Sequence, residues 1–133
     1  MYQIALLAVM FSSLGRQSAC EMDEAVMRIS LNVLLSREMI KPSDRPLNVR
    51  VPEQYADYLP REIEAGESML QINANHLSLP DVTFTNILIL ETGSVRVYFR
   101  TSGSALRYSG TIMLQCAEGK YVFNTVHYVS EIE

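Results

Sequence analysis

The sequence has few of the residues from which proteins build metal, redox and catalytic sites. Its 133 residues include no Trp, two Cys and two His, and the cysteines form no Cys-x-x-Cys motif. No Cys or carboxylate stands at ligand spacing from His76 or His127, and two histidines alone do not complete a zinc site. The sequence also lacks a glycine-rich phosphate loop and a nucleophile elbow. We therefore expect no metal and no cofactor, and we lean towards a protein without catalytic activity.

The charge balance and the apolar runs exclude two further classes of protein. Lys and Arg total 11 and Asp and Glu total 15, which gives a formal net charge of −4. Because neutralising phosphates takes a basic surface, we expect no nucleic-acid partner. The sequence has no stretch of about 20 apolar residues, so we expect no integral membrane span. The hydrophobic fraction of 48% indicates a single globular domain over residues 1–133.

The stretch from Asp81 to Glu133 predicts four consecutive antiparallel strands. Its residues alternate between apolar and polar at period two, and it is rich in the β-branched and aromatic side chains typical of strands. Short polar connections separate the four runs, at Thr92-Gly93, at 101–104 and at Glu118-Gly119.

Uninterrupted alternation assigns the side chains of these strands to two faces. In the first strand it puts Leu88 on the inner side and leaves Ile87 on the other side. In the last strand both faces carry large side chains, which is typical of a strand that lies centrally in a sheet or is covered. On this pattern His127 lies on the same face as Tyr121 and Phe123.

The first half of the chain predicts helices that cover the sheet. Glu21 to Ile40 has apolar residues at helical spacing. Residues 47–51 predict an edge strand or an extended linker, and 69–79 are predicted to be extended. Between them we expect one helical turn over 53–59 and a second short helix from Pro60 to Gly66. Together these elements predict an α+β fold, with N-terminal helices packed on a curved antiparallel sheet of about four to six strands.

Residues 1–19 have two interpretations. The apolar run Ile4 to Phe11, followed by small residues up to Ala19, is typical of a secretory signal peptide. The alternative is a buried N-terminal helix, because no basic residue precedes the run. The first interpretation predicts an exported or periplasmic protein and the second a cytoplasmic one. Cys20 and Cys116 pair in an oxidising compartment or stay free and buried, and their spacing alone does not decide between these states.

The order of the predicted elements points to a known fold family. Helices come first, then a short strand, a further helical segment and a terminal antiparallel meander whose last strand carries His127. This order resembles that of the nuclear-transport-factor-two-like superfamily, and cystatin-like folds share much of it. The resemblance implies a curved sheet that wraps a helix and leaves a conical pocket. Some members use this pocket for isomerase or dehydratase chemistry, with a catalytic Asp–His pair to which His127 would contribute, and others bind proteins.

Two groups of side chains are candidates for a site. A ligand pocket between helix and sheet would be lined by His127, Tyr121 and Tyr108. The alternative for the histidine is a satisfied place in the core. An anion site on the polar side of the sheet would be formed by Arg96, Arg100 and Arg107. Guanidinium groups pair well with carboxylate and phosphate, and the alternative is a solvated outer sheet face.

The sequence favours binding over catalysis. We expect a small protein-interaction or assembly module that binds another protein or itself, as a homodimer through the sheet. Ile87 and Ile89 motivate this expectation, because aliphatic side chains on a half-polar sheet face are typical of a partner surface. The alternative is a pocket-type enzyme or a small-ligand carrier of the nuclear-transport-factor-two-like fold.

Overall fold

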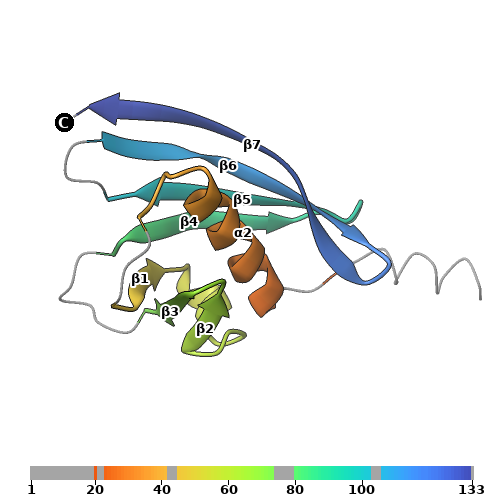
Figure 1. Cartoon of the computed structure of the whole chain (residues 1–133). Coiled ribbons are helices and arrows are strands. Elements are labelled where there is room, and N and C mark those ends of the chain that lie inside the picture. The colour runs from red at the N-terminus through yellow and green to blue at the C-terminus, as the bar shows by residue number, and fades with distance from the viewer. Residues whose placement is uncertain (1–19, 21–22, 42–44, 74–79, 103–105, 133) are drawn as a thin grey trace, which may run out of the picture.

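The computed structural model describes residues 20, 23–41, 45–73, 80–102 and 106–132, so the two interpretations of residues 1–19 lie outside it. The fold is α+β, with a curled sheet of seven strands and a helix packed against it (Figure 1). The helices are α2 (Glu24–Ser36) and the short α3 (Glu53–Ala56). The strands are β1 (Leu47–Arg50), β2 (Glu62–Ala65), β3 (Ser68–Ile72), β4 (Val82–Ile89), β5 (Ser94–Thr101), β6 (Leu106–Ala117) and β7 (Lys120–Ile132).

The sheet is mostly antiparallel and has the order β2-β3-β1-β4-β5-β6-β7. The four consecutive strands predicted for the C-terminal half are confirmed, and each pairs antiparallel with the next. The sheet is larger than predicted, because β2 and β3 add a hairpin at its other end. It is also mixed, because β1 runs parallel to both β3 and β4.

The two sides of the sheet differ in what covers them. The side that carries α2, called the helix face below, forms the core with the buried side of that helix (Figure 1). The opposite side, called the outer face, carries the exposed residues of β5, among them Arg96 and Arg100. In α2 the residues turned towards the core recur at helical spacing and are Val26, Met27, Ser30, Leu31, Val33 and Leu34.

The main helix is shorter than the apolar pattern predicted. The carboxylate of Asp23 caps it, because it accepts a 2.8 Å hydrogen bond from a backbone N–H of the first turn. The helix ends at Ser36 rather than at Ile40, because Glu38 adopts a φ of 60° that no α-helix accommodates. Met39 and Ile40 remain buried after this turn, which explains why the apolar pattern continues past the helix end.

A hairpin of β2 and β3 replaces the short helix that the sequence predicted from Pro60 to Gly66, whereas β3 agrees with the extended conformation predicted from residue 69. β2 and β3 pair antiparallel, with Ala65 opposite Ser68. The predicted helix ending at Gly66 is therefore wrong, and Gly66 instead lies in the two-residue connection with a φ of 62°. Exposed and buried residues alternate along β2, which is the pattern of a half-buried strand.

β1 is a central strand, so its predicted edge position is wrong. Side chains extend its pairing beyond its four residues. Asp81, directly before β4, accepts hydrogen bonds from Asn48 N at 2.8 Å and from both terminal nitrogens of Arg45 at 2.8 and 3.1 Å. The hydrogen bond to Asp81 and the charge of that carboxylate raise the pKa of Arg45 above its ordinary value. At the other end, the amide of Asn73 pairs with Val51 N and Val51 O at 2.9 and 3.2 Å.

A bulge in β4 reverses the predicted orientation of its second half. Phe84 pairs with Phe99 and Asn86 with Tyr98, so Thr85 is an extra residue in β4. Ile87 is therefore buried on the helix face, and Leu88 is exposed on the outer face. The predicted partner surface at Ile87 and Ile89 is wrong, because Ile87 is buried in the core and Ile89 is partly buried against it.

Two side chains stabilise this bulge. Asn86 Oδ1 accepts a 2.9 Å hydrogen bond from Ile87 N. The hydroxyl of Tyr55, in α3, donates a 2.9 Å hydrogen bond to Ile87 O. α3 thus stabilises β4 at the position where its side-chain alternation shifts by one residue.

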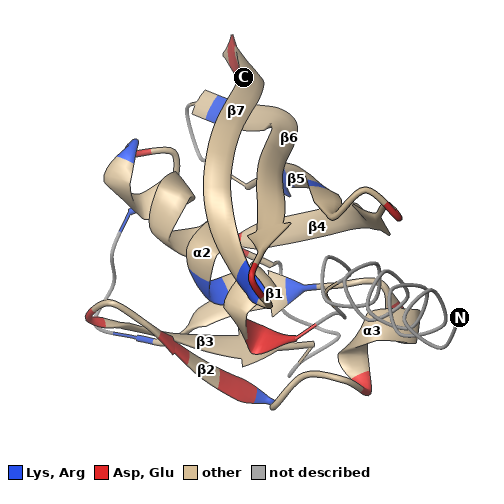
Figure 2. Ribbon diagram, turned by 90° about the vertical axis from the view of Figure 1, so that its right-hand side faces the viewer, with Lys and Arg blue, Asp and Glu red and all other residues tan. Residues whose placement is uncertain are grey.

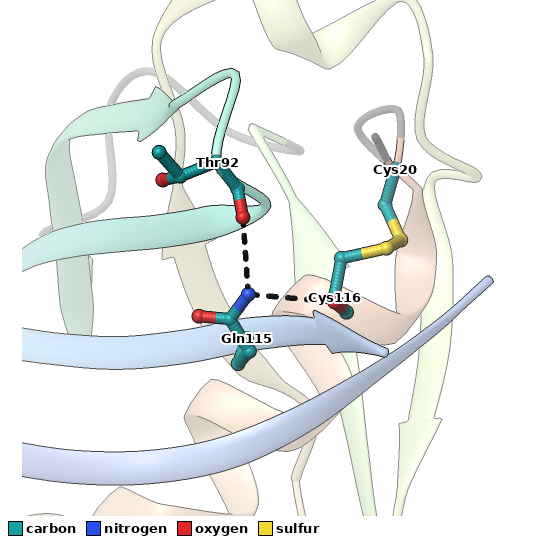
Figure 3. The surroundings of a disulfide bond; sticks show 4 residues. All are labelled: Cys20, Thr92, Gln115 and Cys116. Carbon is teal, nitrogen blue, oxygen red and sulfur yellow. Dashed lines mark hydrogen bonds between the residues drawn. A yellow bond between two sulfur atoms is a disulfide. The ribbon is translucent and has the colours of Figure 1, made fainter. Parts of the chain in front are cut away.

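A disulfide between Cys20 and Cys116 ties the segment before α2 to the end of β6 (Figure 3). The two Cα atoms lie 5.8 Å apart, within the usual range for a disulfide. Cys116 is also held by its backbone, because its N–H donates a 2.8 Å hydrogen bond to Gly93 O. The neighbouring Gln115 side chain donates to Thr92 O at 3.3 Å, so the turn between β4 and β5 packs on the cystine.

Ile87 and Leu88 form a matched pair that tests the bulge. Ile87→Ala should lower the free energy of unfolding by about 2–5 kcal/mol, because it leaves a cavity in the core. Leu88→Ala should change it by less than about 1 kcal/mol, because the side chain already contacts water. Urea unfolding of both variants measures the difference, and a larger loss for Leu88→Ala would contradict the described register.

The disulfide closes a loop with a sequence separation of 96 residues, so breaking it should lower stability substantially. We expect a loss of about 2–5 kcal/mol on reduction, because the linkage restricts the unfolded chain. Thermal unfolding with and without reductant gives the effect. The variant carrying both Cys20→Ala and Cys116→Ala is the control and should not respond to reductant. Titration of two free thiols in the unreduced, unfolded chain would show that the bond is absent.

Candidate functional site at the C-terminal strand

The β6–β7 hairpin is the longest feature of the sheet and forms one of its edges (Figure 1). β6 has 12 residues and β7 has 13. Glu118 and Gly119 connect them with φ values of 55° and 77°, and two positive values in a two-residue loop match the twist of the strands. Within the described residues no strand pairs with the outer edge of β7, so this edge presents unpaired backbone groups.

The edge position of β7 contradicts the expectation from its sequence. Large side chains on both faces predicted a central or covered strand, yet most of β7 is exposed on both faces. Val129 is 61% exposed and Ile132 is 86% exposed. The other exposed large apolar residues of this strand are Val122, Phe123 and Tyr128.

A second bulge sets which side chains of β7 face the helix. Phe123 pairs with Leu114 and Thr125 with Met113, so Asn124 is an extra residue in β7. The residues paired with the helix-face positions of β6 are Tyr121, Phe123, Val126, Tyr128, Ser130 and Ile132. The outer face of β7 carries Lys120, Val122, Thr125, His127, Val129 and Glu131.

Gly110 allows the two strands to approach closely at the middle of the hairpin. A Cβ atom at this position would overlap His127 O and would come within 2.7 Å of the Cα of Tyr128. No other residue type fits there without separating the strands. The gap left by the missing side chain is flanked by Tyr108 and Tyr128, whose rings meet edge to face at 5.9 Å between centroids.

Arg37, directly after α2, contacts a second exposed aromatic side chain of β7. The guanidinium carbon of Arg37 lies 5.9 Å from the ring centroid of Phe123, within the range of a cation–π contact. Phe123 nevertheless remains exposed. The helix therefore orients this ring without burying it.

Charge on β7 is confined to its two ends. Lys120 begins the strand, Glu131 comes near its end, and none of the ten residues between them is charged, as Figure 2 shows. Arg107 of β6 lies directly opposite Glu131 on the outer face. The middle of the exposed edge thus has apolar and polar uncharged side chains, with one positive and one negative end.

The structure does not bring the three predicted pocket residues together. His127 is exposed on the outer face, opposite to the face that carries Tyr121 and Tyr108. The bulge at Asn124 causes this, because it shifts the alternation by one residue before His127. Tyr121 is buried beside Cys116, whereas Tyr108 is half-buried at the other end of β6.

The three predicted arginines do share the outer face. Arg96 and Arg100 are exposed on β5, with Tyr98 between them, and Arg107 is exposed on β6. Arg107 lies opposite Glu131, so its charge is partly balanced by the hairpin itself. The anion site remains a prediction.

No helix in the described ranges is long and apolar enough to cross a membrane. Comparison of the chain with protein-family models, with curated proteins and with solved structures finds no match.

Gly110→Ala tests whether the close approach of β6 and β7 shapes the exposed edge. The added methyl group would collide with the backbone of β7, so we expect a loss of about 1–3 kcal/mol in the free energy of unfolding. The control is Ser109→Ala, at the preceding position of the same strand, which should change stability by less than about 0.5 kcal/mol. Equal stabilities of the two variants in urea unfolding would contradict the described contact.

Proposed function

We propose that this chain is a non-catalytic protein-interaction and assembly module that pairs with another polypeptide along the free edge of β7. The observation that carries the proposal is the mismatch between the sequence of β7 and its position. It has the side chains of a covered strand, yet most of them are exposed, and within the described part of the chain no strand pairs with its outer edge. A strand from a partner would complete it.

The physical basis is the cost of leaving such an edge exposed. Proteins usually protect edge strands by making them short or by adding charged residues and proline. β7 has 13 residues, and the ten between Lys120 and Glu131 include no charge and no proline. Pairing would satisfy the free backbone groups and would cover Val122 and Val129 on one face and Phe123 and Tyr128 on the other.

The disulfide supports a place of action outside reducing compartments. Cys20 and Cys116 are bonded, and such bonds persist in oxidising environments. An exported or periplasmic location follows from this proposal and agrees with the signal-peptide interpretation of residues 1–19.

The proposed membership of the nuclear-transport-factor-two-like superfamily is supported by the packing of α2 against a curled sheet. The alternative function of a pocket enzyme or small-ligand carrier has weaker support, because His127 faces away from the side that carries α2. We therefore favour the protein-binding role among those that the resemblance implies.

Photo-crosslinking from β7 tests the proposed function in the cell that makes the protein. A benzophenone amino acid replaces Val129 in one variant and Tyr58 in a matched control. Tyr58 is 69% exposed and lies outside the hairpin. We expect a defined crosslinked product from position 129 only, because a pairing partner would hold its backbone within reach of that side chain.

The mass of the crosslinked product identifies the partner. A product of twice the chain mass indicates a second copy, and any other defined mass indicates a different protein. The absence of a product from position 129, or equal products from both positions, would contradict binding along β7.

A further inference from the structure

We infer that the partner at this edge is a second copy of the same chain, and that the two β7 strands pair antiparallel about a two-fold axis at Val126. This inference rests on the proposed function and specifies its partner and register. It follows from the order of charged, apolar and aromatic side chains along β7. This order matches that of a second β7 strand running in the opposite direction.

Any register between the β7 strands of the two copies has to allow for the bulge at Asn124. In a symmetric antiparallel pair, residues directly opposite each other lie on the same face of the sheet. Asn124 adds one residue, so Phe123 and Asn124 together face a single position of the second copy. Counting outwards from Val126 with this correction keeps outer-face residues opposite outer-face residues along the whole strand.

The resulting register pairs most of the exposed large apolar side chains of β7 with one another. On the outer face Val122 lies opposite Val129 of the second copy, and Thr125 lies opposite His127. On the helix face Val126 meets Val126, and Phe123 lies opposite Tyr128. Aromatic and β-branched cross-strand pairs of this kind are those that stabilise sheets. Four of the five exposed large apolar residues of β7 gain an apolar neighbour in this way.

The same register pairs the two charged ends of the strand. Lys120 lies opposite Glu131 of the second copy, both on the outer face, and the symmetry repeats this pair at the other end. Arg107 already lies opposite Glu131 within each chain. The carboxylate would therefore lie between two cations, one on each neighbouring strand.

The neighbouring symmetric registers are worse matched. An axis at Thr125 places Val129 opposite Lys120, and an axis at His127 places Glu131 opposite Val122. Both registers place a charged residue beside an aliphatic side chain, and in both Lys120 no longer lies opposite Glu131. Register slips by a single position reverse the faces altogether, so the axis at Val126 is the arrangement that the side chains favour.

Such pairing joins the two sheets into one continuous sheet. A two-fold axis perpendicular to the sheet keeps each face on its own side, so the two α2 helices lie on the same side of the dimer. The outer faces, with Arg96 and Arg100, likewise form one surface.

Charge reversal at the two ends of β7 tests this register on the purified, oxidised chain. We expect wild type to show twice the 15.0 kDa chain mass in light scattering. Lys120→Glu or Glu131→Lys alone should weaken the dimer roughly tenfold or more, because each creates two like-charge pairs. Lys41→Glu and Glu91→Lys are the matched controls, since they change the net charge equally at exposed positions outside the hairpin and should leave the dimer intact.

Mixing the two single variants gives a result that only this register predicts. Lys120→Glu chains are acidic at both ends of β7 and Glu131→Lys chains are basic at both ends, so an equimolar mixture should restore a dimer. The chain that carries both substitutions should also dimerise with itself, within about threefold of wild type. Circular dichroism of each variant confirms that the domain remains folded.

Two results would overturn the inference. One is a wild-type chain that stays monomeric at concentrations up to about 1 mM, which corresponds to binding weaker than about −4 kcal/mol. The other is a dimer that is unaffected by the single reversals. In either case a crosslink from position 129 to a different protein would leave the proposed function standing, whereas the loss of that crosslink would remove both.

Discussion

The side chains of a strand alternate between the two faces of the sheet. One extra residue therefore moves every side chain that follows it to the opposite face. This constraint decides the chemistry of the present domain twice. The bulge at Thr85 sends Ile87 into the core, and the bulge at Asn124 turns His127 away from the helix. Without the second bulge, β7 would present His127 and Val129 towards α2. With it, the outer face of β7 has a positive start, an uncharged middle and a negative end.

Contacts between the β6–β7 hairpin and the rest of the fold gather near the turn of the hairpin. The opposite end of β7 has fewer contacts. Near the turn between β6 and β7, the cystine, the β4–β5 turn and the end of α2 all pack on the two strands. Towards the C-terminus, β6 still pairs with β5, whereas β7 is held by its pairing with β6 and by the contact between Tyr108 and Tyr128. A surface that binds a strand needs such an arrangement, because a rigid base holds the edge in place while the edge itself stays accessible.

The sequence allowed the class of fold, the four C-terminal strands and the main helix to be predicted, because each depends on local pattern. The tight turn at Glu118-Gly119 also has a local signature. The bulges could not be predicted, because Thr85 and Asn124 resemble ordinary strand residues, and only the pairing partners show that they are extra. β2 was missed, although β3 was predicted to be extended, because Gly66 is equally compatible with a helix end and with a turn. The edge position of β7 was missed for a different reason, since strand order is a property of the whole sheet.

The cystine also determines how the domain would carry mechanical tension. A pull applied at Cys20 passes through the sulfur atoms to Cys116, and from there only the short turn separates it from β7. A pull between Cys20 and the C-terminal end would therefore run along a strand that is already extended. The helices and the first six strands up to Cys116 lie outside this load path, so tension would reach the core only where β7 contacts it, at Tyr121 and Val126.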